Sequence, residues 1–211
     1  MDYTPAQQKL IEKHRDINAW DGWHDSVLDD FRTVAARFGI DIRDIYYSGF
    51  WSQGDGACFT TRTVSLDDIL KSGRADGEGG YPEDAGEVVA SFRRLHDMVY
   101  DHIGRHRLLH PEGLRVAENT RFHVYHQGHY YHCNTMYLET DESPDEDDVA
   151  ACVDLDVEHF EGCLRDHLRE CANALYDALE TEYEYQTSDE QVWDSIVANE
   201  LDKEEAEDED E

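Results

Sequence analysis

Two pairs of strand-like segments constrain the fold of this chain more than any other feature of its sequence. Residues 42–51 and 57–64 are rich in β-branched and aromatic residues, as are residues 120–126 and 129–139. Short connections that contain glycine join the two segments of each pair, as in β-hairpins. In the second pair the connection is Gln127-Gly128, which predicts a two-residue turn. We therefore expect two hairpins in one antiparallel sheet.

Helical patterns surround these hairpins. Thr4, with Gln7 three residues later and Pro5 at the first helical position, has the pattern of a capping box. Thr187 or Ser188 is suited to cap a last helix. Apolar residues recurring every three or four positions predict helices at residues 5–18, 23–38, 66–72, 82–103, 155–184 and from 188 onward. No alternation of strand and helix and no internal repeat is present. The predicted fold class is α+β: an antiparallel sheet of two hairpins packed with about five helices.

The length of 211 residues fits one domain with a tail. We expect a single domain over residues 1–201, whose helical part 141–201 is acidic, and a disordered acidic tail over 202–211. No apolar run reaches the length of a membrane span, and the first residues do not form a secretory signal. These features predict a cytoplasmic protein with no membrane contact.

The cysteines predict neither a disulfide framework nor a zinc ribbon. The five cysteines are at positions 58, 133, 152, 163 and 171. Their number is odd, their spacing is irregular and they form no C-x-x-C motif. Cys163 and Cys171 fall on or beside the apolar stripe of the long predicted helix, which favours simple packing. No pairing of cysteine with histidine is specific enough to indicate a thiol enzyme.

Negative charge is concentrated at the end of the chain. The net charge is −32, and residues 139–211 contain 29 acidic and three basic residues. The first 138 residues carry only −6 of that charge. A solvated face, a solubilising tail or salt adaptation can explain such acidity, although salt adaptation predicts acidic residues over the whole surface. Docking to a basic partner is the other class of explanation.

A sharper interpretation is imitation of nucleic acid. Carboxylates four residues apart on a helix rise by about 6 Å, close to the step between phosphates. A cationic groove would attract such an array, and salt would weaken the attraction. The candidate row consists of Glu158, Glu161, Asp166, Glu170, Asp177, Glu180, Glu184, Asp189, Glu190 and Asp194.

The segment SGFWSQGDGACF, residues 48–59, has the form of a hairpin connection. Its glycines supply the positive φ angles that such a loop needs. It matches neither a dinucleotide-binding nor a phosphate-binding loop, and no nucleophile elbow is present. A structural hairpin tip is favoured over a recognition loop that would use Trp51 and Asp55. A catalytic role for Ser52 or Cys58 is the remaining alternative.

Histidines and tyrosines alternate in FHVYHQGHYYHC, residues 122–133. With a two-residue turn, His123 would face His132 across the strands and both could bind one metal ion. A third ligand would have to come from elsewhere in the chain. Ordinary sheet packing and an interaction face rich in tyrosine are the alternatives.

Three segments together resemble a family of phage and prophage proteins of unknown function: SGFWSQGDGACF (48–59), GHYYH (128–132) and EYEYQTSDEQVWDSIVANE (182–200). The resemblance spans most of the chain. It brings no reaction, cofactor or catalytic residue. It implies a mobile-element setting, in which acidic inhibitors of host DNA-binding defences occur.

The sequence thus favours a non-enzymatic phage-type inhibitor, a DNA mimic without a cofactor. It would act in the host cytoplasm and bind a basic nucleic-acid-binding host protein by electrostatic competition. Direct nucleic-acid binding is not expected, because a chain of charge −32 repels phosphate. Homodimerisation stays open. The alternative is a small metal-dependent or nucleotide-handling enzyme centred on residues 122–133.

Overall fold

The computed structural model describes residues 3–20, 22–72, 86–104, 121–142 and 157–202. The chain packs into two compact units. Unit 1 consists of residues 1–27 and 178–211, and unit 2 of residues 28–177. Both boundaries fall inside helices, α2 (Asp25–Arg37) and α8 (Val157–Gln186). No glycine, proline or polar linker therefore marks them in the sequence.

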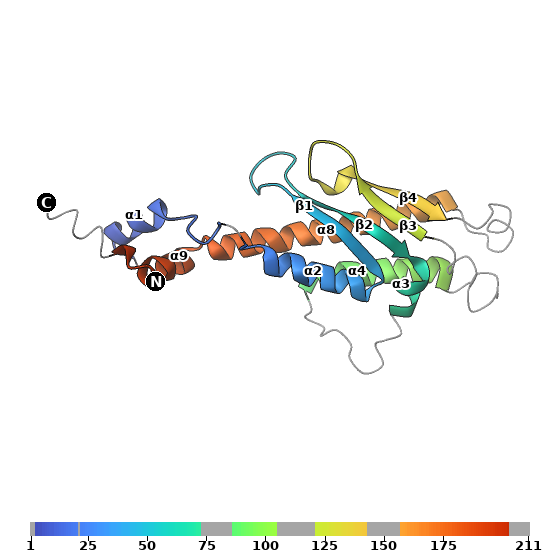
Figure 1. Ribbon diagram of the computed structural model, residues 1–211, viewed down its shortest axis with the longest axis horizontal. Helices are drawn as coiled ribbons and strands as arrows, with labels where there is room; N and C mark the ends of the chain where they lie inside the picture. Colours follow the sequence, from blue (N-terminus) through green and yellow to red (C-terminus); the bar gives the residue numbers. More distant parts are fainter. Residues whose placement is uncertain (1–2, 21, 73–85, 105–120, 143–156, 203–211) are drawn as a thin grey trace. The chain divides into compact units, whose positions relative to one another are not determined.

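Unit 2 is built on a four-stranded antiparallel sheet with strand order β1-β2-β3-β4 (Figure 1). The strands are β1 (Ile40–Tyr47), β2 (Ala57–Ser65), β3 (Arg121–His126) and β4 (Met136–Glu142). The first hairpin is β1–β2 and the second is β3–β4. The predicted α+β class, with an antiparallel sheet of two hairpins, is confirmed.

Helices pack on one face of this sheet (Figure 1). They are α2, α4 (Gly86–Val99) and the part of α8 that belongs to unit 2, while α3 (Leu66–Ser72) follows β2 directly. The ring of Phe31 on α2 lies 5.5 Å from Phe59 on β2 and 5.4 Å from Phe92 on α4. Phe160 of α8 lies 6.4 Å from Phe122 of β3. These buried rings hold the helices on the sheet.

Unit 1 is a small helical body with α1 (Pro5–Lys13), α9 (Asp189–Ala198) and the end of α8. The predicted capping box of Thr4 and Gln7 is confirmed, and Ser188 caps α9. The core consists of Leu10, Ile11, Val192 and Ile196. Arg15 donates a hydrogen bond to the carbonyl of Thr187 at 3.0 Å, which joins the ends of the chain within this unit.

The second hairpin differs from the prediction. Strand β4 begins at Met136 rather than at residue 129, and residues 127–135 form a long connection that ends in a 3-10 turn, η3 (Cys133–Thr135). His123 therefore pairs with Glu139 and not with His132. The observed register places Leu138 beside the buried Val124, whereas the predicted one would have placed Tyr131 there. Burial of the apolar face sets the register.

None of the helices described by the structure is apolar over a length that could cross a bilayer. Several predicted features lie outside the described residues. They are Cys152, the start of the helix expected from Pro82, most of the acidic connection after residue 142, and the tail over 203–211.

Replacing Phe31 by alanine should destabilise unit 2 by about 3–5 kcal/mol, because a nearly fully buried ring leaves a cavity between α2, α4 and the sheet. Urea unfolding followed by circular dichroism measures this loss. The matched control is Tyr130→Ala, which removes an exposed ring and should change the unfolding free energy by less than about 0.5 kcal/mol. Equal losses in the two variants would contradict this core assignment.

Candidate interaction surfaces

The two hairpin connections pack against each other. Gly56 is buried, and a Cβ atom at this position would lie 2.9 Å from Cδ2 of His132 and 3.2 Å from the carbonyl oxygen of Tyr131. Only glycine allows this approach. Gly54 has a φ of +100°, and a Cβ atom at this position would lie 3.6 Å from Cδ1 of the Tyr130 ring. Gly54 and Gly56 of SGFWSQGDGACF therefore serve the contact between the two loops.

The first loop is held in one conformation by its own hydrogen bonds. The carboxylate of Asp55 accepts from the backbone N–H groups of Trp51 at 3.0 Å and Ser52 at 2.6 Å. The hydroxyl of Ser48 accepts from the N–H of Gly56, and Tyr176 of α8 donates to the carbonyl of Gly49 at 3.0 Å. Asp55 is thus a positioning residue of the loop, so its carboxylate is engaged by the backbone.

Aromatic side chains gather at the ends of the two hairpins. The side chain of Trp51 is 77% exposed and that of Tyr130 67% exposed. Tyr131 stacks on Tyr46 of β1 with ring centroids 5.1 Å apart, and His126 lies 5.5 Å from Tyr131. We call these five residues the tip surface. Rigid loops that present tyrosine and tryptophan among glycine and serine are typical of protein-binding surfaces.

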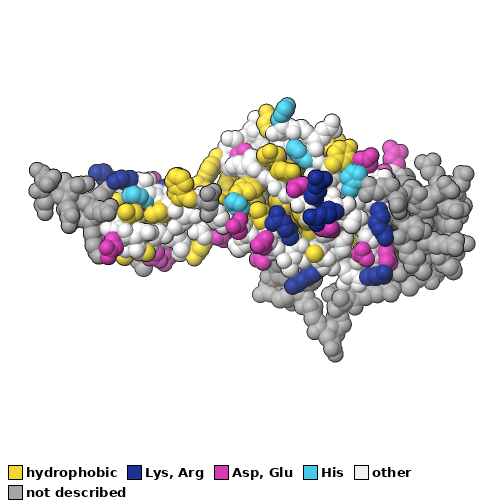
Figure 2. Space-filling model, in the orientation of Figure 1, with side chains coloured by type: hydrophobic (Ala, Val, Ile, Leu, Met, Phe, Trp, Pro, Cys, Tyr) yellow, Lys and Arg dark blue, Asp and Glu magenta, His cyan; other side chains and the backbone are white. Residues whose placement is uncertain are grey.

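The sheet face opposite the helices carries paired charges and further aromatic rings. Tyr125 and Tyr137 stack with centroids 5.6 Å apart, and His123 lies 3.3 Å from the carboxylate of Glu139. Arg62 contacts Asp41 at 3.0 Å. Figure 2 shows Lys and Arg side chains grouped over the strands and hydrophobic side chains at the hairpin tips. This face is therefore mixed in charge rather than acidic.

The cysteines beside the tip surface do not supply a nucleophile. Cys58 is buried beneath the second loop, and this burial raises the pKa of its thiol to about 11. Burial also raises the pKa of Cys133. Since the thiolate is the reactive form, both thiols are poor nucleophiles near neutral pH.

In unit 2, three of the predicted carboxylates share one face of α8. Asp166, Glu170 and Asp177 lie within about 40° of one another at 100° per residue. Arg169 and Arg165 flank Asp166, and Arg94 of α4 contacts Glu170 at 3.4 Å. Basic neighbours thus compensate part of this array.

Two of the predicted members depart from that face. Glu158 lies about 80° from Asp166 around the helix, and Glu161 about 140°. The carboxylate of Glu161 accepts a hydrogen bond of 2.8 Å from Thr140 of β4. Glu161 therefore fixes α8 to the sheet instead of extending an acidic row.

The acidity of unit 1 is less compensated. Its sequence contains 20 acidic and four basic residues, a net charge of −16. Among the carboxylates predicted here, Glu184, Asp189, Glu190 and Asp194 are exposed and Glu180 is half-buried. Arg15 pairs with Asp189. Partial burial, followed by the charges of Glu190, Asp189 and Asp194, raises the pKa of Tyr3. Three carboxylates thus create a negative potential around one ring.

The metal site predicted at His123 and His132 lacks the expected geometry. His132 uses Nδ1 to accept a hydrogen bond of 3.1 Å from the backbone N–H of Asn134, which caps the 3-10 turn. Within the described ranges, one group of three potential ligands occurs, and it comprises His102, His159 and Cys163 instead. The sequence signal for it was the spacing His159-x-x-x-Cys163 on a predicted helix.

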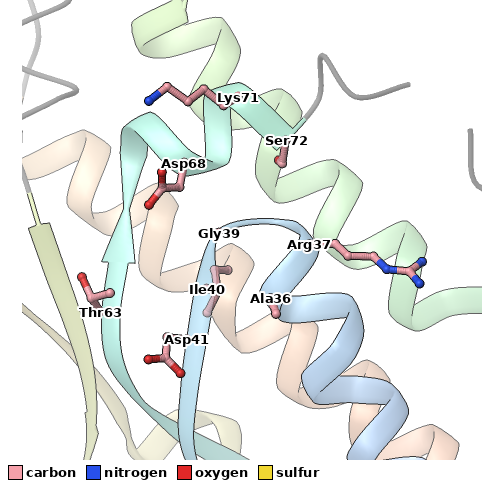
Figure 3. Close-up of a pocket in the computed structure, with 9 residues that line it drawn as sticks. All are labelled: Ala36, Arg37, Gly39, Ile40, Asp41, Thr63, Asp68, Lys71 and Ser72. Atoms are coloured by element: carbon pink, nitrogen blue, oxygen red, sulfur yellow. The ribbon is translucent and has the colours of Figure 1, made fainter. Parts of the chain in front are cut away.

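A pocket of about 530 Å³ lies between the end of α2, the first residues of β1 and helix α3 (Figure 3). Its lining includes Asp41, Asp68 and Lys71 but neither histidine nor cysteine. Figure 3 shows the guanidinium of Arg37 turned away from both carboxylates. Lys71 pairs with Asp67. These neighbours do not form an arrangement for acid–base or nucleophilic chemistry.

Replacing Gly56 by alanine should destabilise unit 2 by about 1–3 kcal/mol and loosen the tip surface, because the added methyl group overlaps His132. Urea unfolding measures the stability, and quenching of tryptophan fluorescence follows the loop. The matched control is Gly49→Ala, whose methyl group would sit at an ordinary contact distance of 3.4 Å from Asp55. A tolerated Gly56→Ala would show that the loops are not closely packed.

Comparisons with known proteins place the chain in a family. Neither the search of curated proteins nor the search of solved structures found a match. A family model described as a domain of unknown function, DUF8835, matches residues 23–189. The matched residues include all of unit 2, with its sheet, its tip surface and the group of His102, His159 and Cys163. Because the match covers most of its length, the chain belongs to the DUF8835 family.

Proposed function

We propose that this protein is a non-enzymatic, acidic interaction protein that binds the basic surface of a nucleic-acid-binding protein. The binding is electrostatic competition: carboxylates occupy the cationic groove that phosphates would otherwise fill. A phage or prophage setting, in which the partner is a host defence protein, follows from the resemblance of three sequence segments. This setting is part of the proposal, as is action in the host cytoplasm.

The observation that carries the proposal is the acidity of unit 1, which basic residues compensate only in small part. Among its described residues, three basic side chains accompany 11 acidic ones. Such self-repulsion destabilises a small helical body, whose core cluster of buried apolar residues has four members. A basic partner would relieve this repulsion on binding.

The tip surface supports a protein partner rather than a small substrate. Trp51 is a large exposed ring on a loop that Asp55 already holds in one conformation. Tryptophan and tyrosine dominate binding energy at protein interfaces, and a preorganised loop loses little entropy on binding. Aromatic contacts of the tip surface would then add affinity to the electrostatic attraction.

Neutralising exposed carboxylates of unit 1 should weaken the partner complex. The triple variant Glu184→Gln, Glu190→Gln, Asp194→Asn should lose about tenfold in affinity, at about 0.5 kcal/mol for each exposed charge pair. Partners are first captured from host lysate at low salt and released at about 0.5 M salt, where screening is nearly complete. Fluorescence anisotropy then measures competition with labelled duplex DNA for the identified partner.

The matched control removes the same number of charges from unit 2, as Asp29→Asn, Asp30→Asn, Asp97→Asn. All three carboxylates are exposed. This control should compete with DNA like the wild type. A partner that binds no nucleic acid would exclude the proposed mechanism. Equal losses in both triple variants would show that only net charge matters and that unit 1 is not the interface.

Removing the indole of Trp51 should weaken the same complex without lowering protein stability. We expect Trp51→Ala to lose at least about tenfold in affinity, as anchor residues at interfaces do. The comparison variant is Trp20→Ala, which removes an equally exposed indole outside the tip surface. Affinity for the identified partner is measured by titration calorimetry. If Trp51→Ala binds like the wild type, the tip surface has no part in recognition.

A further inference from the structure

A cluster of three side chains in unit 2 has the composition and spacing of a transition-metal site. It comprises His102 of the π-helical turn η2 (Tyr100–Gly104) with His159 and Cys163 of α8, and their ligand atoms all lie within 4.8 Å of one another. We propose that these residues bind one Zn²⁺ ion, with a fourth coordination position left for water or an exogenous ligand. This site is independent of the proposed interaction function.

The two ligands on α8 already have nearly the separation that zinc requires. His159 and Cys163 are four residues apart, so their side chains lie on the same side of the helix. The Sγ atom of Cys163 lies 3.7 Å from Nε2 of His159. A tetrahedral zinc ion with ordinary Zn–N and Zn–S bonds holds these two atoms about 3.5 Å apart. The ion therefore needs only a small rotation of the side chains.

The third ligand is presented in a defined tautomer. Nδ1 of His102 lies 2.9 Å from the backbone carbonyl of Met98, so this nitrogen carries the hydrogen and donates it. Nε2 is then the atom with a lone pair for the metal. Metal-binding histidines characteristically donate their other ring N–H to a carbonyl or carboxylate in this way. The π-helical turn gives a second sign, because π-helical turns occur frequently at functional sites.

The surroundings allow an ion to enter while holding the ligands in place. The buried ring of Phe160 lies 5.8 Å from the ring of His102 and provides an apolar neighbour. His159 is exposed, while His102 and Cys163 are half-buried. The described part of the chain adds no fourth histidine, cysteine or carboxylate to this group. Three protein ligands with an open position are typical of reactive or exchangeable zinc sites, whereas structural sites are closed.

The ligand chemistry selects the ion. A thiolate and two imidazoles prefer Zn²⁺ and its neighbours in the first transition series to Mg²⁺ or Ca²⁺, which prefer oxygen ligands. On binding, the thiol of Cys163 releases its proton to solvent as the Zn–S bond forms. The ion would join the end of α4, through η2, to α8, so binding should also raise the melting temperature of unit 2.

The test is a Co²⁺ titration of the full-length reduced chain after treatment with a chelator. Cobalt replaces zinc in such sites and reports a thiolate ligand by a charge-transfer band in the near ultraviolet. We expect one equivalent to bind with this band and with intense visible bands, and Zn²⁺ to displace it. Cys163→Ser should abolish the charge-transfer band. The Cys163→Ser variant should also bind cobalt at least about 100-fold more weakly. Losing a residue that only supports a ligand costs up to about 100-fold in metal affinity, and losing a ligand itself should cost at least as much.

The matched control is His123→Gln, His132→Gln, which removes two histidines outside the cluster and should leave cobalt binding unchanged. Weak binding of several equivalents without the charge-transfer band would overturn the proposal, because exposed carboxylates would then be the ligands. A band that persists in Cys163→Ser would also overturn it. Circular dichroism of each variant checks that the fold is intact.

A second readout does not depend on cobalt. Iodoacetamide should alkylate Cys163 in the metal-free chain, and Zn²⁺ should protect it, as mapped by mass spectrometry of peptides. Cys58 and Cys171 serve as internal references, since burial raises the pKa of their thiols to about 11 and about 12. They should stay unreactive in both states. Alkylation of Cys163 at the same rate with and without Zn²⁺ would contradict the site.

Discussion

The contact between one face of the sheet and the helices α2, α4 and α8 is the interaction on which the rest of unit 2 depends. Phe31, Phe59 and Phe92 meet there with ring separations near 5.5 Å. Because side chains alternate along a strand, burying Phe122 and Val124 sends the neighbouring polar and aromatic residues of β3 to the opposite face. The same burial on α8 turns Asp166 and Glu170 outward. The core thus determines which side chains remain available for binding.

The surface at the hairpin tips follows from a second packing constraint. Gly56 lies so close to His132 that a side chain at this position would push the two loops apart. Asp55 and Ser48 then satisfy backbone N–H groups that a loop of this shape leaves without partners in the sheet. The conformational restriction that results is what makes an exposed indole useful, because the loop is ordered before a partner arrives. In SGFWSQGDGACF, Ser48, Asp55 and Gly56 therefore have structural roles.

Local signals in the sequence predicted elements better than contacts. The capping residues Thr4 and Ser188 mark the starts of α1 and α9, since each cap satisfies backbone groups only a few residues away. The register of β3 and β4 was missed, because Gln127-Gly128 has the composition of a tight turn while burial of Val124 and Met136 decides the pairing. Helical periodicity identified the carboxylates on α8, but the partners of Glu161 and Glu170 lie on other elements. The sequence of one helix does not predict such partners.

The same limit explains why the sequence does not predict the cluster of histidine and cysteine. His159 and Cys163 are neighbours on one helix, whereas His102 is more than 50 residues away and approaches them only when α4 and α8 pack side by side on the sheet. The family match covers residues 23–189 and so contains this cluster and the tip surface, but it stops before Glu190 and Asp194 of α9. Loss of metal binding and loss of partner binding would separate the two roles experimentally, since the residues of the metal cluster belong neither to the tip surface nor to the carboxylates of unit 1.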